Sequence, residues 1–518
     1  MEKPNEIEKP KIGAVAELSL LEKVIYFAIY LYFFAMAVYQ VYIFPQENPK
    51  ELYSPDFTDG WKILGRKKDN SDFEWQYWKR LMVPLMIGLS LHSVGNRLVS
   101  WLYPQYRMAY FAIFPFGCLT YSLGWKQTMI FLGHNVVYFI ASKTKSIVIC
   151  WLLCISLLIS FVSFNQSIKL QFYTFNRNRW EGDFALITSL MCQLKGTSFC
   201  LDSCYAAKKE KSTNTIKYGF VDLIGYNFYL PLFCSGPVVN FDDFYIQVSK
   251  PPAPLSKKVL KSFAWDGVRS IFWHFVVEIS SHYLYVSSLS KDLYIIENYS
   301  LFFSSGLVYL QVLFFSVKYV IFYRVAGMYS RLDGINPPDI PMCVLNIYLF
   351  TTMWKTFDKG LHNWLMKYIY IPLGGSKNGA FRQMLSSITT FGYVYYWHGA
   401  YVHFVYWSLI QWFGVFLEAM MGKLEKTKTF QYIEHNMSSP TTRRLHALAG
   451  MCSLISGILS NNIFLIGIHP ILAYLKAVFL KGSSWNIFWF FAVAYCLVQV
   501  IMEVKIRTKL KPKFTKIT

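Results

Sequence analysis

Residues 389–407 read TTFGYVYYWHGAYVHFVYW and contain no acidic side chain, lysine or arginine. At 1.5 Å per residue, a helix of about this length crosses the ~30 Å hydrocarbon core of a bilayer. The stretch belongs to an apolar segment at 386–417. Similar segments lie near 24–42, 81–94, 107–123, 127–141, 146–164, 264–288, 300–323, 444–467 and 485–503. We therefore expect an all-α polytopic membrane protein with about ten transmembrane helices.

Four shorter apolar pieces are interrupted by glycine, proline or charge. They lie near 184–194, 220–239, 341–354 and 364–375. Irregular backbone is tolerated at membrane depth only where protein or a water-filled cavity surrounds it. These pieces therefore predict re-entrant or broken segments inside the helical bundle.

The composition supports a membrane protein and excludes other classes. Of the 518 residues, 54% are hydrophobic and only 16% are charged, against about 25% charged in soluble domains. The net charge is +21, from 51 Lys+Arg and 30 Asp+Glu. The basic residues lie between apolar runs instead of covering one polar face, which argues against a nucleic-acid partner and for a lipid bilayer.

The charge pattern also divides the chain. We expect a cytosolic N-terminal segment at 1–23, a single polytopic domain at 24–503, and a basic cytosolic tail at 504–518. The tail argues for the cytosolic side because basic residues are enriched in cytosolic segments. Outside the membrane segments, the sequence has no stretch long and apolar enough for a separate catalytic domain, so the chemistry is expected within the membrane.

His398 is the first candidate for that chemistry, because ionisable groups in apolar segments are costly and are functional candidates by default. An imidazole in a dry cavity is a suitable general base. The alternative is a core histidine satisfied by a neighbouring carbonyl, of which His403 in the same segment is an example.

The second candidate lies in MWKTFDKGLHNWLMKYIYIPLGGS, residues 353–376. Asp358 and His362 are four residues apart, so a helix would place them on one face, with Asn363 beside them. The alternative is a structural aspartate paired with Lys355 or Lys359. Further histidines at metal-ligand spacing are absent from the stretch, which argues against zinc.

The order of these motifs resembles the membrane-bound O-acyltransferase family, and more closely its hedgehog acyltransferase branch. The shared features are Asp358, the turn at 371–375, and Trp397-His398-Gly399 within an apolar helix. Further blocks of the branch are similar to SRLDGINPPDIPMCV at 330–344, GTSFCLD at 196–202 and YLPLFCSGPVVNFDDF at 229–244. The resemblance covers residues 180–470 best.

The resemblance implies an enzyme that moves palmitoyl from palmitoyl-CoA to the N-terminal amine, a cysteine, of a secreted hedgehog-type signalling protein. Acyl-CoA would enter from the cytosol and the protein from the lumen, and they would meet in a central reaction tunnel. Members that acylate lipids, sterols or serines usually have Asn where this chain has Asp358. Inactive relatives of the branch lack the histidine that His398 provides. His398 would take the proton and Asp358 would orient the substrate, although Asp358 as the base is equally compatible with the sequence.

The resemblance also implies further site residues. Trp354 and Lys355 correspond to a Trp-Arg pair near the acyl-CoA, and Asn461 corresponds to an asparagine lining the reaction cavity. His362 and Asn363 are assigned to substrate binding with them. Cys343 corresponds to a cysteine that ligates the iron of haem b, in a structural role.

The expected location is the membrane of the endoplasmic reticulum, with the Golgi as the alternative. Two other functions remain open on the sequence. The first is O-acylation of a serine or a lysolipid, which Asp358 disfavours. The second is a non-catalytic transporter, because broken segments and intramembrane charge suit transporters too. The hydropathy shows no inverted repeat, which argues against it.

Overall fold

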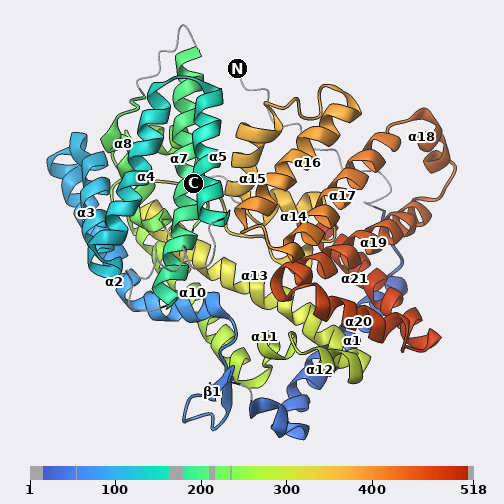
Figure 1. Cartoon of the computed structure of the whole chain (residues 1–518). Helices are drawn as coiled ribbons and strands as arrows, with labels where there is room; N and C mark the ends of the chain where they lie inside the picture. Colours follow the sequence, from blue (N-terminus) through green and yellow to red (C-terminus); the bar gives the residue numbers. More distant parts are fainter. Residues whose placement is uncertain (1–15, 54, 164–178, 209–215, 234–235, 511–518) are drawn as a thin grey trace.

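The computed structural model describes residues 16–53, 55–163, 179–208, 216–233 and 236–510, and these are almost entirely helical (Figure 1). The longer helices are α1 (Leu20–Glu47), α2 (Phe73–Leu102), α3 (Arg107–Leu123), α4 (Trp125–Lys143), α5 (Ile147–Ser163), α7 (Arg179–Lys208), α10 (Lys257–Tyr283), α13 (Leu301–Leu332), α16 (Gly379–Trp397), α17 (Val402–Leu424), α19 (Ser439–Ile466), α20 (Ile468–Phe479) and α21 (Ser484–Leu510).

Short elements connect them. These are α8 (Phe220–Phe228), α9 (Phe241–Val248), α11 (Val286–Leu289), α12 (Leu293–Asn298), α14 (Phe350–Thr356), α15 (Lys359–Leu365), α18 (Lys428–His435), and single turns η2 (Pro49–Tyr53), η3 (Pro104–Tyr106), η4 (Leu230–Leu232), η5 (Val344–Asn346) and η6 (Met366–Tyr370). One antiparallel hairpin, β1 (Phe57–Asp59) with β2 (Lys67–Asp69), is the only sheet in the described residues. Most of the terminal segments 1–23 and 504–518 lies outside the described residues.

Six of the described helices are long and apolar enough to cross a membrane: α1, α7, α13, α17, α19 and α21. Serine caps start several of them, α13 and α19 among them. The hydroxyl of Ser300 accepts the N–H of Phe303 at the start of α13, and Ser438 accepts the N–H of Thr441 at the start of α19. Such a cap satisfies a backbone donor that the helix itself leaves free. The prediction of an all-helical polytopic membrane protein is confirmed.

α13 is the central helix of the bundle. It runs diagonally through the middle of the molecule in Figure 1, and α1, α2, α10, α11, α12, α19 and α20 all pack on it. About half of its apolar window is buried. A helix surrounded in this way can present side chains to the site from one fixed position.

Two sequence predictions about the helices are wrong. The piece at 184–194 is not broken, because it lies within the continuous 30-residue helix α7. The segment at 386–417 is not one helix, because it divides into α16 and α17 at residues 398–401. His398 therefore lies at a helix end and not within an apolar helix, with consequences for the site.

Candidate active site

Asp358 is the N-cap residue of α15 and follows the short helix α14 by two residues. Its Oδ1 accepts the backbone N–H of Leu361 at 2.9 Å, which is why aspartate is favoured at this position. Its Oδ2 accepts the hydroxyl of Tyr323, from α13, at 2.6 Å. The two hydrogen bonds define the orientation of the carboxylate before any substrate binds.

Gly360 allows α15 to approach the chain close to Asp358. A Cβ atom at this position would lie 2.4 Å from the carbonyl oxygen of Val238. Because this contact is to the backbone, a side chain at 360 would displace the start of the helix. The glycine therefore sets the depth of the helix end that carries Asp358.

His398 ends α16, and a tight turn follows it. Gly399 has φ 112° and Ala400 has φ 55°, so two consecutive residues adopt positive φ, which is uncommon for alanine. The turn is closed by hydrogen bonds from the N–H of Gly399 to the oxygen of Tyr396 and from the Tyr395 hydroxyl to the oxygen of Ala400. α17 then leaves in a new direction, and the imidazole is presented at the break between the two helices.

Four aromatic rings surround the half-buried imidazole of His398. Their centroids lie 4.8 Å (Trp397), 6.0 Å (Phe404), 5.5 Å (Trp407) and 4.9 Å (Phe464) from that of the imidazole. Within the described part of the chain, the imidazole has no hydrogen-bond partner. The alternative of a core histidine satisfied by a carbonyl is not what the structure shows.

A chain of polar contacts joins Trp354 to Asn461 beside this ring cluster. The indole N–H of Trp354 donates to Gln411 Oε1 at 2.9 Å, and Gln411 Nε2 donates to Asn461 Oδ1 at 3.2 Å. The ring of Trp354 lies 5.9 Å from that of Trp407. The neighbouring Asn462 instead donates to the carbonyl of Val308 in α13, so Asn461 is the member of the asparagine pair that faces the site.

Rings also connect Asp358 to His398. Phe357, next to Asp358, stacks on Phe315 at 5.6 Å, and Phe315 lies 6.4 Å from Phe464, which contacts the imidazole. Asp358 and His398 make no hydrogen bond to each other in the described structure. The structure thus brings both candidates to one region but leaves them to act on a substrate separately.

The remaining predicted site residues lie at the edge of this region. Lys355 and Asn363 are exposed, and His362 is half-buried in α15. Lys355 is close enough to His362 for an electrostatic interaction. The alternative prediction paired Asp358 with Lys355 or Lys359. Lys359 instead pairs with Asp339 at 2.7 Å, and Asp358 accepts hydrogen bonds from a hydroxyl and a backbone N–H.

α7 supports both halves of the site through two indoles. Trp397, next to His398, donates to the carbonyl of Leu190 at 3.1 Å, and Trp364 of α15 donates to that of Leu194 at 2.9 Å. Both carbonyls lie in the piece that the sequence suggested was broken. The continuous helix α7 therefore holds the segments of His398 and of α15 at a fixed spacing.

The motif at 196–202 is joined to the segment that follows 236. Ser198 accepts the N–H of Phe241 at 2.8 Å, and the buried Asp202 accepts that of Asp242 at 3.2 Å. Asp202 also pairs at 2.7 Å with Lys367 of η6, which directly follows α15. These contacts give the two motifs a structural role in holding α15.

Two residues of the site and one residue of the neighbouring face of α13 are not marked by the sequence motifs. Tyr323 and Gln411 bind Asp358 and Asn461, but neither is ionisable at neutral pH, and nothing local distinguishes them from other polar residues. Lys318 lies inside the expected span 300–323 and is buried. A lysine within an apolar span is a functional signal that could have drawn attention to this face of α13.

A family model of the membrane-bound O-acyltransferases matches residues 136–460. This is more than half of the chain, and the chain belongs to that family. Within it, the chain is 33% identical to protein-cysteine N-palmitoyltransferase HHAT of Mus musculus over 477 residues, covering 89% of this chain and 93% of that protein. It is 25% identical to protein-cysteine N-palmitoyltransferase Rasp of Drosophila melanogaster over 490 residues, covering 93% and 95%.

A further relative, membrane-bound O-acyltransferase gup1 of Schizosaccharomyces pombe, is 24% identical over 558 residues, covering 96% and 90%. The higher identity to the mouse protein places the chain in the hedgehog acyltransferase branch. The expectation drawn from the motifs is thereby confirmed at the level of family and branch.

Proposed function

We propose that this protein moves a palmitoyl group from palmitoyl-CoA to the N-terminal amine of a cysteine in a secreted, hedgehog-type signalling protein. The observation that carries the proposal is the match to mouse protein-cysteine N-palmitoyltransferase HHAT along 93% of that protein. The position of Asp358 and His398 at two helix ends connected by a series of ring contacts supports it.

The chemistry requires positioning and one proton transfer. The amine nitrogen attacks the thioester carbon, the C–S bond breaks, and the thiolate of coenzyme A leaves. His398 takes the proton from the attacking amine and returns it to the thiolate. An N-terminal amine has an ordinary pKa of about 7.7–8.0, so much of it is neutral near physiological pH. The thioester is already activated, and the enzyme therefore gains most from holding the two substrates in line.

Asp358 orients the amine in this proposal. Its carboxylate is already held by two hydrogen bonds, so it can accept an N–H of the amine without reorganising. His398 is better suited to move the proton because its ring nitrogens are not engaged by the described protein. Asp358→Asn retains the shape and the N-cap contact, and it separates the two roles: the variant keeps measurable transfer if the carboxylate only orients the amine.

Acyl-CoA binding is assigned to the other edge of the site. Trp354 and Asn461 share Gln411 as a hydrogen-bond partner, and Asn461 lines an apolar hollow beside α14. The exposed Lys355 supplies positive charge for the phosphates of coenzyme A, although it lacks the bidentate geometry of an arginine. His362 and Asn363, on the first turns of α15, are assigned to substrate binding with it.

We include haem b, held by Cys343, in the proposal. The thiol is exposed and lies at the start of η5, whose Val344 and Leu345 line an apolar hollow with Tyr309. Tyr309 also borders a larger apolar cavity of about 980 Å³ between α1, α13, α19 and α21. A thiolate beside an apolar space fits a haem ligand, and the group would supply iron–thiolate ligation that fixes this segment.

The haem proposal has a spectroscopic test. The purified protein should show haem absorption that Cys343→Ser removes, while palmitoyl transfer continues. An identical spectrum in the variant would contradict the assignment of Cys343.

The same proposal places the enzyme in the membrane of the endoplasmic reticulum or the Golgi, where a secreted substrate passes. The polytopic domain at 24–503 carries the activity, and the segments 1–23 and 504–518 lie in the cytosol. Glycosylation tags fused to each end test this: neither tag should be modified. Modification of either tag would reverse the orientation of that end.

The decisive experiment is transfer of labelled palmitoyl from palmitoyl-CoA to a peptide with an N-terminal cysteine. His398→Ala should abolish it. His403→Ala is the matched control, because this histidine lies five residues away and stacks on Tyr401 instead. Normal transfer in His398→Ala, at equal expression, would refute the proposed chemistry.

A second peptide tests the acceptor. Blocking the N-terminal amine should stop the reaction. Unreduced acylation of the blocked peptide would instead indicate a hydroxyl or thiol acceptor, as in an O-acyltransferase. Release of coenzyme A in step with acylation separates both enzymes from a transporter, which would release none.

A further inference from the structure

We propose that Tyr323 is a positioning residue of the transfer reaction. Its hydroxyl fixes the carboxylate of Asp358, and an ion-pair cluster around the buried Lys318, about one turn earlier, fixes the part of α13 that carries it. The inference rests on the proposed function, because it assigns a role to Tyr323 in that same reaction. It adds a residue that neither motif of the site contains.

The hydrogen bond itself is the first observation. The Tyr323 hydroxyl lies 2.6 Å from Asp358 Oδ2, and Tyr323 is 7% exposed. Hydrogen bonds to a charged group are shorter and about twice as strong as neutral ones. Because the other carboxylate oxygen caps α15, removal of the tyrosine hydroxyl leaves the carboxylate free to turn about the remaining contact.

Neighbouring residues on the same face of α13 hold the segment around Asp358. Phe315, Tyr319 and Tyr323 are spaced by four residues and therefore lie along one side of the helix. Phe315 and Tyr319 both contact Phe357, with centroids at 5.6 and 5.9 Å. This face of α13 thus packs on Phe357 and bonds Asp358, the next residue.

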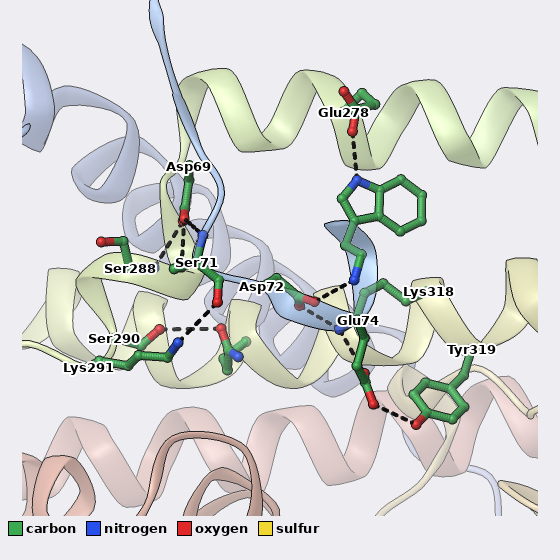
Figure 2. A network of polar contacts seen from close by, with 12 residues as sticks. Asp69, Ser71, Asp72, Glu74, Glu278, Ser288, Ser290, Lys291, Lys318 and Tyr319 are labelled. Carbon is green, nitrogen blue, oxygen red and sulfur yellow. Dashed lines mark hydrogen bonds and ion pairs between the residues drawn. The ribbon is translucent and has the colours of Figure 1, made fainter. Parts of the chain in front are cut away.

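The ion-pair cluster fixes that face of α13 in place (Figure 2). Lys318, whose side chain is 4% exposed, pairs with Asp72 and with Glu74, the latter at 3.1 Å. The hydroxyl of Tyr319 donates to Glu74 at 3.1 Å. Figure 2 shows these groups converging from the start of α2 onto α13. Because removing one partner of a buried ion pair is costly, the pairing of Lys318 with two carboxylates at the start of α2 opposes rotation and sliding of α13.

The start of α2 is in turn tied to α10. Asp72 caps α2 by accepting the N–H of Trp75 at 2.9 Å, and the indole of Trp75 donates to Glu278 of α10 at 2.6 Å. Tyr323 is therefore the last link of a contact series that begins at two helices outside the site. Its hydroxyl is the only part of the series that reaches Asp358.

The experiment compares two variants that each remove one buried tyrosine hydroxyl from α13. Tyr323→Phe removes the bond to Asp358. Tyr329→Phe is the matched control, because its hydroxyl bonds Ser90, at 2.9 Å, away from the site. Transfer of labelled palmitoyl to the N-terminal cysteine peptide is measured for wild type and both variants, with kcat and the KM for palmitoyl-CoA determined separately.

We expect Tyr323→Phe to lower kcat roughly 10- to 100-fold, because a misoriented catalytic group costs up to about two orders of magnitude. The KM for palmitoyl-CoA should change less than about threefold, because the acyl-CoA contacts involve other residues. Tyr329→Phe should retain wild-type kinetics, and the two variants should unfold at similar temperatures.

Three results would overturn the inference. One is a kcat within twofold of wild type in Tyr323→Phe, and another is an equal loss in Tyr329→Phe. The third is a Tyr323→Phe protein that loses acyl-CoA binding or thermal stability relative to the control, which would assign the residue to the fold. Wild-type enzyme that acylates no peptide would instead refute the proposed function, so the two failures are distinguishable.

Discussion

Gly360→Ala tests whether the position of Asp358 controls the rate of transfer. A Cβ at 360 would lie 2.4 Å from the oxygen and 2.6 Å from the nitrogen of Val238, whereas ordinary contact begins at 3.4 Å. Both atoms belong to the backbone of a buried segment, so a rotamer change cannot relieve the overlap. The first turn of α15 must therefore move by about 1 Å, as expected for overpacking of a dense interior.

The shift is transmitted directly to the candidate residue, because Asp358 caps the same turn. A displacement of about 1 Å near the reacting atoms costs roughly 100-fold in rate, so we expect kcat to fall by about that factor. The KM for palmitoyl-CoA should change less than kcat, since Trp354, Lys355 and Asn461 lie outside α15 and only His362 and Asn363 move with it. Overpacking should also destabilise the protein by about 1–3 kcal/mol.

Gly392→Ala is the matched control in the same assay of labelled palmitoyl transfer. Gly392 lies within α16, and a Cβ there meets no heavy atom within 4 Å. Alanine is favoured over glycine in a helix by about 0.5–1 kcal/mol, so this variant should keep its rate and unfold at a slightly higher temperature. Wild-type kcat in Gly360→Ala would refute the reasoning, because α15 would then have relaxed without moving Asp358.

Two further predictions concern other contacts. Gln411→Leu leaves Trp354 and Asn461 without their shared partner, and the loss of a buried hydrogen-bonding partner costs about 1–3 kcal/mol. The KM for palmitoyl-CoA should rise severalfold in steady-state kinetics, and an unchanged KM would remove Asn461 from the acyl-CoA site. The second prediction concerns Glu297 of α12, which lies outside the six membrane-crossing helices. Hydrogen bonds from Lys476 and Lys481 lower the pKa of this carboxyl group to about 2. The stability from these pairs is present above the ordinary pKa of 4.5 and is lost as the pH falls toward 2. The melting temperature should therefore drop more steeply between about pH 4.5 and pH 2 in wild type than in Glu297→Gln, and parallel curves would contradict the assignment.

Hydropathy predicted the existence and position of most helices because the signal is local. The span expected at 107–123 coincides with α3, and that at 444–467 ends one residue beyond α19. Long apolar runs have few alternatives in a bilayer, since each backbone group must be bonded within its own segment. Fold class was therefore accessible from the sequence.

The break beside His398 was not accessible from hydropathy, because the residues on both sides are apolar. Its physical cause is a turn in which Gly399 and Ala400 both take positive φ. A single glycine is a weak signal, and alanine at positive φ contradicts local preference. The glycine next to the candidate histidine is visible in the sequence, but the change in chain direction that it permits is not.

Some residues of the candidate site could likewise be predicted from the sequence, and others could not. Asp358 and His398 were found because charge in an apolar stretch is visible in one sequence. Gln411 lies 57 positions from its partner Trp354, and Tyr323 lies 35 from Asp358. Contacts over such separations depend on how helices pack, and a neutral side chain carries no mark of them.

Because Trp397 and Trp364 both bond α7, this helix sets the spacing between the segments that carry His398 and Asp358. The carbonyl acceptors of the two indoles, Leu190 and Leu194, are one helical turn apart, which at 1.5 Å per residue corresponds to about 6 Å. A one-residue insertion between them would rotate one carbonyl acceptor by about 100° around the helix. The tryptophan that bonds this carbonyl would lose its hydrogen bond. Length changes in a helix without any reacting group would then inactivate the protein as surely as losing His398.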